Sequence, residues 1–398
     1  MSSSEPRPRP AVPFSVELPA DALYEVLLRL PAKDLCRFRA VCPAWCALTS
    51  DPLFVTAHKS RHHTAPPLLA TAYRDADGVS GVAISDLSGN VLKRIPSAGY
   101  TFVMKIAGDA IGRFTSKDDS IIVLSARLDL VCFSWEDYSE ALWVLNPTTG
   151  ATIDLPTGRS ETESCAFGQV LRVSRIGDCC QPQVCEVITF DDTNHGSWRR
   201  KQDPPCYISS RCRTGCVVVD GVVYFLMDFY STYFRTRMKT TGPGSIAAFD
   251  LETEDWTGVR PGPEPVHRFV QENEVYGYPK LELMLSLAEL DGCLVMVHNI
   301  HYKSMDLWFL TDFEKGTWVK RYSMPSHVAR PYRYPFLMLD DGRIFFSGSD
   351  GLQGLFSVGE QGRGFVRSYD SRNDTYSDVL KLEDSRSISI YTGSLLSL

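Results

Sequence analysis

The chain has 398 residues, a length that suits a small module joined to one large repeat domain. Hydrophobic residues make up 44% and charged residues 22%, which is a globular composition with enough apolar mass for a sizeable core. The formal net charge of −7 argues against nucleic-acid binding, because contacts to phosphate need clustered lysine and arginine.

Residues 1–15 contain four prolines among serine and arginine, and we expect a disordered tail rather than a proline-rich ligand. The tail lacks the apolar segment of a signal peptide, and no run of 18 apolar residues follows, so no membrane partner is expected. The twelve cysteines are therefore expected to be thiols in a reducing cytoplasmic or nuclear compartment. Zinc is disfavoured because C-x-x-C pairs are lacking in the two cysteine clusters, Cys179, Cys180 and Cys185, and Cys206, Cys212 and Cys216.

Residues 16–58 have helical periodicity. Leu23, Val26, Leu27 and Leu30 lie at i, i+3, i+4 and i+7, which predicts one apolar stripe on a helix. Pro31 ends this helix, and two more short helices are expected over 32–40 and 43–49. Three short helices cannot bury this many large apolar side chains. The surplus predicts either packing against the large domain or a surface that binds a partner.

The segment "ELPADALYEVLLRLPAKDLCRFRAVCPAWCALTSDPLF" resembles an F-box in the type and spacing of about a dozen positions. The resemblance implies docking to the Skp-type adaptor of an SCF-type cullin–RING ubiquitin ligase. The implied adaptor-binding residues are Leu18, Pro19, Leu23, Val26, Leu27, Leu30, Pro31, Leu35, Phe38, Val41 and Trp45. Pro43 and Cys46 depart from the family, which usually has basic residues there, but the apolar anchors that dominate such interfaces are retained.

After a linker over 59–68, residues 69–398 contain a repeated hairpin. Each copy is a β-rich run, a turn that starts with Asp or Asn, and a second strand. The turn residues are Asp86, Asn146, Asp191, Asp250, Asp312 and Asp370, with separations of 60, 45, 59, 62 and 58 residues. This near-constant spacing predicts about six structural repeats.

A second type of hairpin falls between most of these copies. Asp-Gly turns between apolar runs predict it at 217–226, 287–297 and 336–346, a weaker copy is expected at 116–126, and none is clear between 146 and 191. Two hairpins per repeat predict a mainly β protein: a three-helix F-box followed by a β-propeller-like domain of about six four-stranded units. An array of β-sandwiches is the alternative. The phrases "LWVLNPTTGATIDLP" and "LWFLTDFEKGTWVKRYSM" resemble the F-box-associated β domains of plant proteins.

Candidate catalytic and metal sites are weak. His298 and His301 form an H-x-x-H, but residues three apart on a strand point to opposite faces, so a structural or surface role is favoured over a metal site. Neither nucleotide-binding nor hydrolase motifs occur. We therefore expect no cofactor and no catalysis, with a propeller enzyme as a minor alternative.

Tyrosine and arginine are concentrated in two segments expected to be loops, 228–239 and 327–335. These residue types are favoured at protein interfaces, although ordinary loop surface is the other interpretation. The candidate target-binding residues are Tyr230, Tyr233, Arg235, Arg237, Arg330, Tyr332 and Arg333. The sequence thus predicts a non-catalytic receptor that binds the adaptor, and through it cullin, and holds a target protein of unknown identity. A regulatory scaffold that binds the adaptor without promoting degradation is the alternative.

Overall fold

The computed structural model describes part of the chain, and it forms two compact units, Met1–Pro66 with Ser394–Leu398, and Pro67–Gly393. The described residues are 20–30, 43–51, 53–54, 57–58, 67–97, 100–105, 111–116, 121–127, 130–135, 138–147, 150–155, 162–166, 169–175, 182–191, 194–195, 197–209, 215–228, 242, 244–266, 284–300, 304–325, 333–349, 364–382 and 388–391.

The first unit is helical. Helix α1 (Ala20–Leu28) carries Leu23, Val26 and Leu27 of the predicted stripe, whereas Leu30 lies in the turn that follows it. Helix α3 (Pro43–Ser50) begins at the proline expected to start the third helix. The second expected helix, 32–40, lies outside the described residues. Leu27, Leu28 and Phe54 are buried together and form the core of this unit.

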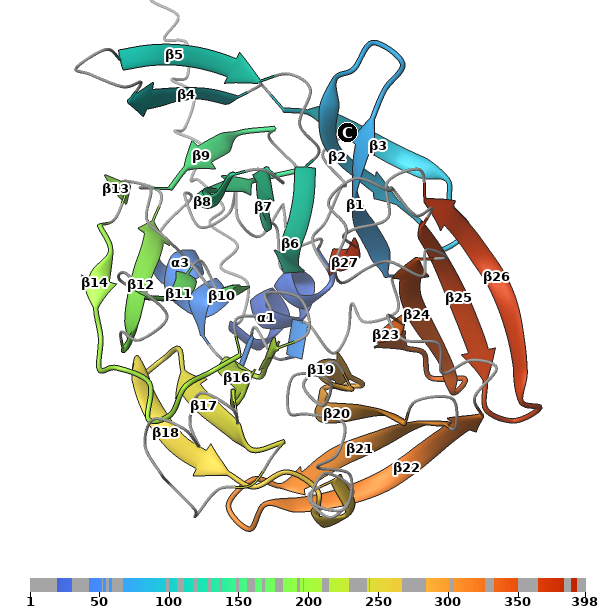
Figure 1. The fold of residues 1–398 in the computed structure, drawn as a ribbon. Coiled ribbons are helices and arrows are strands. Elements are labelled where there is room, and N and C mark those ends of the chain that lie inside the picture. Colours follow the sequence, from blue (N-terminus) through green and yellow to red (C-terminus); the bar gives the residue numbers. More distant parts are fainter. Residues whose placement is uncertain are drawn as a thin grey trace, which may run out of the picture. The chain divides into compact units, whose positions relative to one another are not determined.

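The second unit is a β-propeller whose six sheets, here called blades 1 to 6, surround a central axis (Figure 1). Blade 1 contains, from the centre outward, β27 (Ile388–Tyr391), β1 (Leu68–Arg74), β2 (Ser80–Ser85) and β3 (Val91–Pro96). Blade 2 contains β6 (Ile121–Arg127), β7 (Leu130–Trp135), β8 (Tyr138–Leu145) and β9 (Thr152–Asp154). Blade 3 contains β10 (Thr162–Ala166), β11 (Gln169–Arg175), β12 (Gln183–Asp191), and two short outer pieces, β13 (Asn194–His195) and β14 (Arg199–Arg200).

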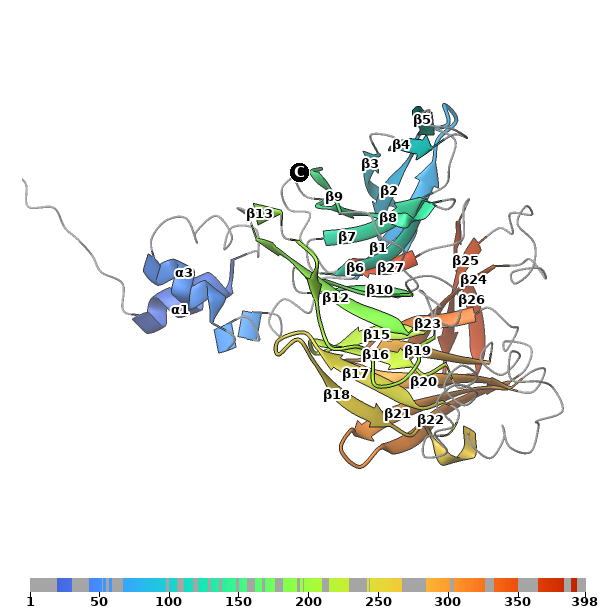
Figure 2. The ribbon, with the colours of Figure 1, turned by 60° about the vertical axis from the view of Figure 1, so that its left-hand side comes forward.

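The remaining blades have four strands each, in chain order from the centre outward. Blade 4 contains β15 (Cys216–Val219), β16 (Val222–Leu226), β17 (Ile246–Asp250) and β18 (Asp255–Arg260). Blade 5 contains β19 (Leu285–Leu290), β20 (Cys293–Ile300), β21 (Ser304–Asp312) and β22 (Thr317–Pro325). Blade 6 contains β23 (Arg333–Met338), β24 (Arg343–Ser349), β25 (Gly364–Asp370) and β26 (Thr375–Leu382). An additional hairpin, β4 (Tyr100–Lys105) with β5 (Ile111–Ser116), forms a separate two-stranded sheet (Figures 1 and 2).

The ring is closed by strands from the two ends of the propeller. The last strand, β27, pairs with the first, β1, so that Leu68 lies opposite Tyr391 and Thr71 opposite Ile388. The six innermost strands contact one another in the order β27, β6, β10, β15, β19, β23 and back to β27. The predicted propeller is therefore confirmed, and the β-sandwich alternative is wrong.

The apolar cores lie between neighbouring blades rather than inside single sheets. Val187 of blade 3, for example, packs in one cluster with Phe225 and Phe249 of blade 4, and Phe309 of blade 5 packs with Phe346 of blade 6. Each sheet therefore covers the face of the next one, and burial on both faces explains the continuous apolar runs in the inner strands.

The six repeated turn residues all lie where the third strand of a blade turns into the fourth. Asp191, Asp250, Asp312 and Asp370 are the last residues of their third strands, and Asp86 and Asn146 directly follow theirs. Asp86, Asp250, Asp312 and Asp370 accept hydrogen bonds through Oδ1 from backbone N–H groups two to four residues further on, which is the role expected for Asp at this position. The Asn146 turn is closed by a 2.9 Å hydrogen bond from its N–H to the oxygen of Ala151. The side chain of Asp191 lies outside the described side chains.

The Asp-Gly hairpins join the first and second strands of blades 4, 5 and 6, as predicted. In the turn at Asp291 and Gly292, φ is positive at both residues, 53° and 68°, which favours Asn, Asp and Gly. The expected weaker copy at 116–126 is wrong, because β5 pairs with β4 while β6 starts blade 2 and pairs with β7. In blade 3, β10 pairs with β11 with Ala166 opposite Gln169, and no Asp-Gly pair lies between these two residues in the sequence.

Two equivalent tryptophans connect outer strands of adjacent blades. The indole N–H of Trp256 in blade 4 donates to the carbonyl oxygen of Gln202, which follows blade 3, over 2.9 Å. Trp318 in blade 5 donates in the same way to Pro261, which follows blade 4, over 3.0 Å. Ion pairs run parallel to these bonds, from Arg199 to Glu254 and from Arg260 to Glu314. The repeat therefore fixes each of these blades to the one before it at the periphery.

The cysteines differ from expectation at one described position. Cys185, Cys206, Cys216 and Cys293 are not disulfide-bonded, and burial raises the pKa of Cys185 and of Cys206 to about 12. Cys132, buried on β7, is disulfide-bonded, although thiols were expected throughout. The sequence could not indicate this pairing, because chain spacing does not show which strands the propeller brings together. Among the described residues, no group of three potential metal ligands occurs.

Candidate functional site

The described part of α1 separates the predicted adaptor-binding residues into two groups. Leu27 is 0% exposed at the centre of the module core, and Leu23, Leu30 and Trp45 pack against that core while half-buried. Val26, in contrast, is 49% exposed. Leu27 therefore stabilises the module from inside, whereas Val26 presents apolar surface to solvent. The other predicted residues lie outside the described residues: Leu18, Pro19, Pro31, Leu35, Phe38 and Val41.

The segment after α3 adds a residue that the sequence analysis missed. Asp51 Oδ1 accepts hydrogen bonds from the N–H groups of Leu53 (2.7 Å) and Phe54 (3.3 Å), which fixes a short helical turn. This turn buries Phe54 in the core and leaves Leu53 78% exposed. Neighbouring side chains on a helical turn point in different directions, and here the turn directs Phe54 into the core and Leu53 away from it. The "LF" pair alone does not tell which of its two residues is exposed.

The same segment holds α1 through aromatic contacts. The ring of Phe54 packs edge-on against Tyr24, with centroids 5.2 Å apart, and stacks on His58 at 6.1 Å. His58 Nε2 lies 2.8 Å from the carbonyl oxygen of Leu30, where the imidazole N–H donates to the last turn after α1. Val26 is therefore exposed on a helix whose position is supported by Asp51, Phe54 and His58.

The two ends of the propeller differ. Because the strands of each blade alternate in direction, the first-to-second and third-to-fourth connections lie at one end, here called the short-turn end. These connections are tight, as at 220–221, 291–292 and 313–316. The opposite end, the long-connection end, carries the much longer segments 227–245, 261–284 and 350–363. The chain enters the propeller at the short-turn end, where Leu68 begins β1 opposite Tyr391.

Both predicted target-binding segments join strands at the long-connection end. Segment 228–239 follows β16 and precedes β17, and segment 327–335 joins β22 to β23. Tyr230, Tyr233, Arg235, Arg237, Arg330 and Tyr332 lie outside the described residues, as does the side chain of Arg333. The expectation that the second loop extends to 335 is wrong, because Arg333 to Pro335 pair with Phe346 to Gly348 in blade 6.

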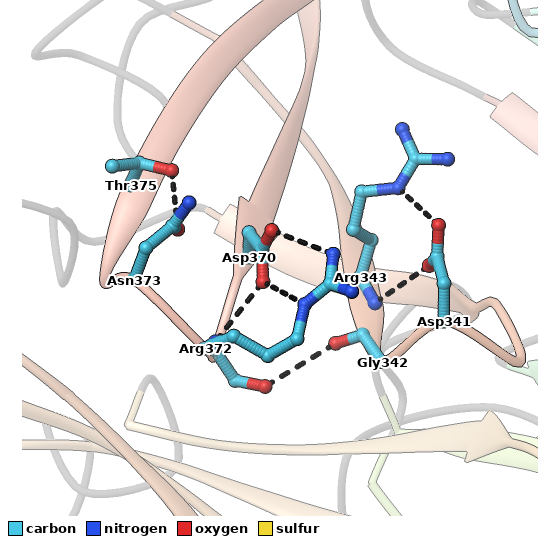
Figure 3. A network of polar contacts seen from close by, with 8 residues as sticks. Asp341, Gly342, Arg343, Asp370, Arg372, Asn373 and Thr375 are labelled. Atoms are coloured by element: carbon cyan, nitrogen blue, oxygen red, sulfur yellow. Dashed lines mark hydrogen bonds and ion pairs between the residues drawn. The ribbon is translucent and has the colours of Figure 1, made fainter.

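At the short-turn end of blade 6 the charged side chains are paired with one another (Figure 3). Asp370 accepts hydrogen bonds from the backbone N–H, Nε and Nη2 of Arg372, at 2.8–3.0 Å, and these bonds lower the pKa of Asp370 to about 2. Asp341 accepts from the backbone and Nε of Arg343, and Ser371 Oγ donates to the oxygen of Gly342 at 3.5 Å. These groups stabilise the two turns and are largely satisfied within the blade.

His298 lies inside the protein. It is buried on β20 opposite Asp306 of β21, and burial is the main reason that its pKa falls to about 4. Asp306 accepts hydrogen bonds from Ser323 Oγ at 2.6 Å and Lys320 Nζ at 3.2 Å. A neutral imidazole in this setting is consistent with the predicted structural role. His301 lies outside the described residues.

Family models identify both units. The model for the "F-box domain" matches residues 16–56, and that for the "F-box associated beta propeller domain" matches residues 113–349, more than half of the chain. The chain is an F-box protein with an F-box-associated β-propeller. The family resemblance inferred from the motifs is confirmed.

Curated relatives agree with this identification. F-box/kelch-repeat protein At3g23880 of Arabidopsis thaliana is 25% identical over 82% of this chain and 84% of its own length. F-box protein At1g53790 of the same plant is 24% identical over 77% of this chain and 65% of its own length. Among solved structures, that of YjhT has a TM-score of 0.40 and 11% identity, covering 66% of this chain and 84% of its own, which is too distant to carry functional information.

Membership has general consequences. F-box proteins serve as substrate adaptors of SCF ubiquitin ligases, and an F-box implies binding to a Skp1-type adaptor. Proteins of this family are typically non-catalytic. None of the helices in the described part of the chain has the length and apolar character needed to cross a membrane.

Proposed function

We propose that this F-box protein is a non-catalytic substrate receptor of an SCF-type ubiquitin ligase. The F-box docks on the Skp-type adaptor, and the propeller binds a target protein. Tethering raises the concentration of target lysines near the ubiquitin-conjugating enzyme, so the chain itself needs no catalytic group.

The observation that carries the adaptor role is the exposure of Val26 and Leu53 on a module whose own core is already filled by Leu27, Leu28 and Phe54. Apolar side chains left outside a filled core are the usual anchors of an interface. Val26 and Leu53 are therefore the most exposed contacts that we propose within the described residues, and the half-buried Leu23, Leu30 and Trp45 remain proposed contacts beside them. Leu18, Pro19, Pro31, Leu35, Phe38 and Val41 remain proposed contacts on the basis of family resemblance.

The test is calorimetric titration of the full chain with a purified Skp-type adaptor. Val26→Asp and Leu53→Asp should each weaken binding by about thirtyfold or more, since a truncated or charged anchor costs about 2 kcal/mol or more. Because both side chains are exposed, the fold should be retained, which circular dichroism will check. Val319→Asp, at a site 44% exposed on blade 5, is the matched control and should bind normally. No binding by the unmodified chain would refute the adaptor role.

For the target we propose the long-connection end. This end carries the longest connections and both Tyr- and Arg-rich segments, whereas the short-turn end has tight, internally paired turns and the chain entry. The proposed contacts are Tyr230, Tyr233, Arg235, Arg237, Arg330, Tyr332 and Arg333.

The corresponding experiment compares proteins cross-linked to the full chain in cells with those cross-linked to a Tyr233→Ala, Arg235→Ala, Arg237→Ala variant. A target should be lost in this variant and kept in a control with Lys315→Ala and Arg372→Ala at the short-turn end. If both variants keep the same proteins, the target surface lies elsewhere. Target abundance after proteasome inhibition then separates a degradative receptor, for which it rises, from a regulatory scaffold, for which it does not.

A further inference from the structure

The segment that follows the helices of the F-box makes a contact for which the apolar stripe alone does not account. His58, near the end of the module, reaches the carbonyl oxygen of Leu30, 28 positions earlier, over 2.8 Å. We propose that His58 is a positioning residue for adaptor binding: its imidazole N–H fixes the C-terminal end of α1 and thereby the orientation of the apolar residues that contact the adaptor. This inference rests on the proposed adaptor role.

The end of α1 needs such a partner. The last carbonyl groups of a helix have no acceptor role within the helix, and a following proline cannot extend it. Here the N–H groups of Arg29 and Leu30 donate to Val26 and Leu27, both at 3.1 Å, in a tightened last turn. The oxygen of Leu30, at the end of this turn, accepts the bond from His58, and the residue after Leu30 is Pro31. The donor for it comes from a distant part of the chain rather than from the helix.

His58 is itself held in place. Its ring stacks on Phe54 at 6.1 Å with an interplanar angle of 21°, and Phe54 is almost completely buried against Tyr24. Asp51 fixes the turn that carries Phe54. A continuous series of contacts thus links Asp51, Phe54, His58 and Leu30. It joins the exposed Leu53, which lies on the same turn, to the last turn of α1, one residue from Pro31.

Two functions of the imidazole can be separated by substitution. His58→Phe keeps an aromatic ring that can stack on Phe54 but removes the N–H donor. His58→Gln loses the ring but retains an N–H donor two bonds beyond Cγ. If the hydrogen bond orients the end of α1, the donor decides adaptor affinity, and His58→Gln should retain what His58→Phe loses.

The experiment titrates each full-length variant with the purified Skp-type adaptor and records amide exchange at residues 29 and 30. We expect His58→Phe to bind about three- to tenfold more weakly, the range given by one hydrogen bond. Amide exchange at the end of α1 should accelerate in this variant. In His58→Gln, the adaptor affinity and the exchange rate should both lie within about twofold of those of the unmodified chain.

A matched control removes another hydrogen bond from the same module. Thr49→Val deletes the bond from Thr49 Oγ1 to the oxygen of Trp45 (2.7 Å) in α3 without touching the end of α1. It should lower the stability of the module and leave adaptor affinity within about twofold of that of the unmodified chain.

Equal losses of affinity in Thr49→Val and His58→Phe would mean that affinity follows stability alone, and would overturn the positioning role. So would normal binding by His58→Phe, or failure of His58→Gln to restore it. Absence of binding by the unmodified chain would overturn the adaptor role as well, while unchanged amide exchange in His58→Phe would refute only the positioning contact.

Discussion

Tyr391 tests the closure of the propeller. It ends β27, is 1% exposed, lies opposite Leu68, and belongs to the strand that closes the ring. Replacing it by Ala removes a buried aromatic ring and leaves a cavity, which costs about 3–5 kcal/mol in known cases. A typical domain has only about 5–15 kcal/mol of stability, so the loss is a large fraction of the total. Since β27 also contacts β6 and β23, the effect should reach blades 2 and 6.

The measurement is urea unfolding of the full chain, followed by tryptophan fluorescence and circular dichroism. With a slope of about 3 kcal/mol per molar urea, the Tyr391→Ala midpoint should fall by about 1 M or more. Val319→Ala, at an exposed site on the outer strand of blade 5, should change stability by no more than about 0.5 kcal/mol. Amide exchange in β1 should also accelerate in Tyr391→Ala. A loss below about 1 kcal/mol would show that β27 does not hold the ring closed.

Three further predictions concern the propeller. Gly262→Ala would place a Cβ atom 2.4 Å from a backbone oxygen, so this variant should lose about 2 kcal/mol or more of stability in urea unfolding. Gly292→Ala, where φ is +68° but the surrounding space is open, should lose about 1 kcal/mol. Equal losses in the two variants would contradict the steric explanation. Trp318→Phe removes the indole donor to the preceding blade and should lower stability by about 0.5–1.5 kcal/mol, and an unchanged midpoint would show that this bond is not formed in solution. The pKa of His298 is about 4 in the folded chain against an ordinary value of 6.5, so the unfolded chain takes up a proton first as the pH falls. The free energy of unfolding should therefore fall by about 3 kcal/mol between pH 6.5 and pH 4, compared with the change in a His298→Gln variant. Parallel pH profiles of the two proteins would refute this prediction.

The sequence was sufficient for the architecture because its strongest signals are local. In four of the third-to-fourth-strand turns an Asp side chain accepts hydrogen bonds from backbone N–H groups a few residues away, and Asp-Gly turns favour positive φ. Both signals can therefore be recognised without tertiary information. The failure at 116–126 has the same origin. Acidic turn residues there resemble a hairpin, but the strands on either side belong to different sheets, and only pairing decides that.

The apolar stripe of the F-box could also be predicted from the sequence, since the spacing of its four residues, Leu23, Val26, Leu27 and Leu30, follows the helical period. Periodicity places residues on one side of a helix but does not say which of them the module itself covers. Folding buries Leu27 and leaves Val26 exposed, and it exposes Leu53 beside buried Phe54. That division depends on how Tyr24, Phe54 and α1 pack together.

By itself, then, the sequence determined an F-box followed by about six four-stranded repeats, because helix period, turn chemistry and repeat spacing are encoded within short windows. Only the tertiary structure decided that the sixth blade is followed by a strand that returns to the first, that tryptophans bond from one blade to the previous one, and that His58 reaches Leu30. These contacts join residues between 28 and more than 300 positions apart. No local pattern specifies such pairs, since they form when buried surfaces and unpaired backbone groups find partners in the folded chain.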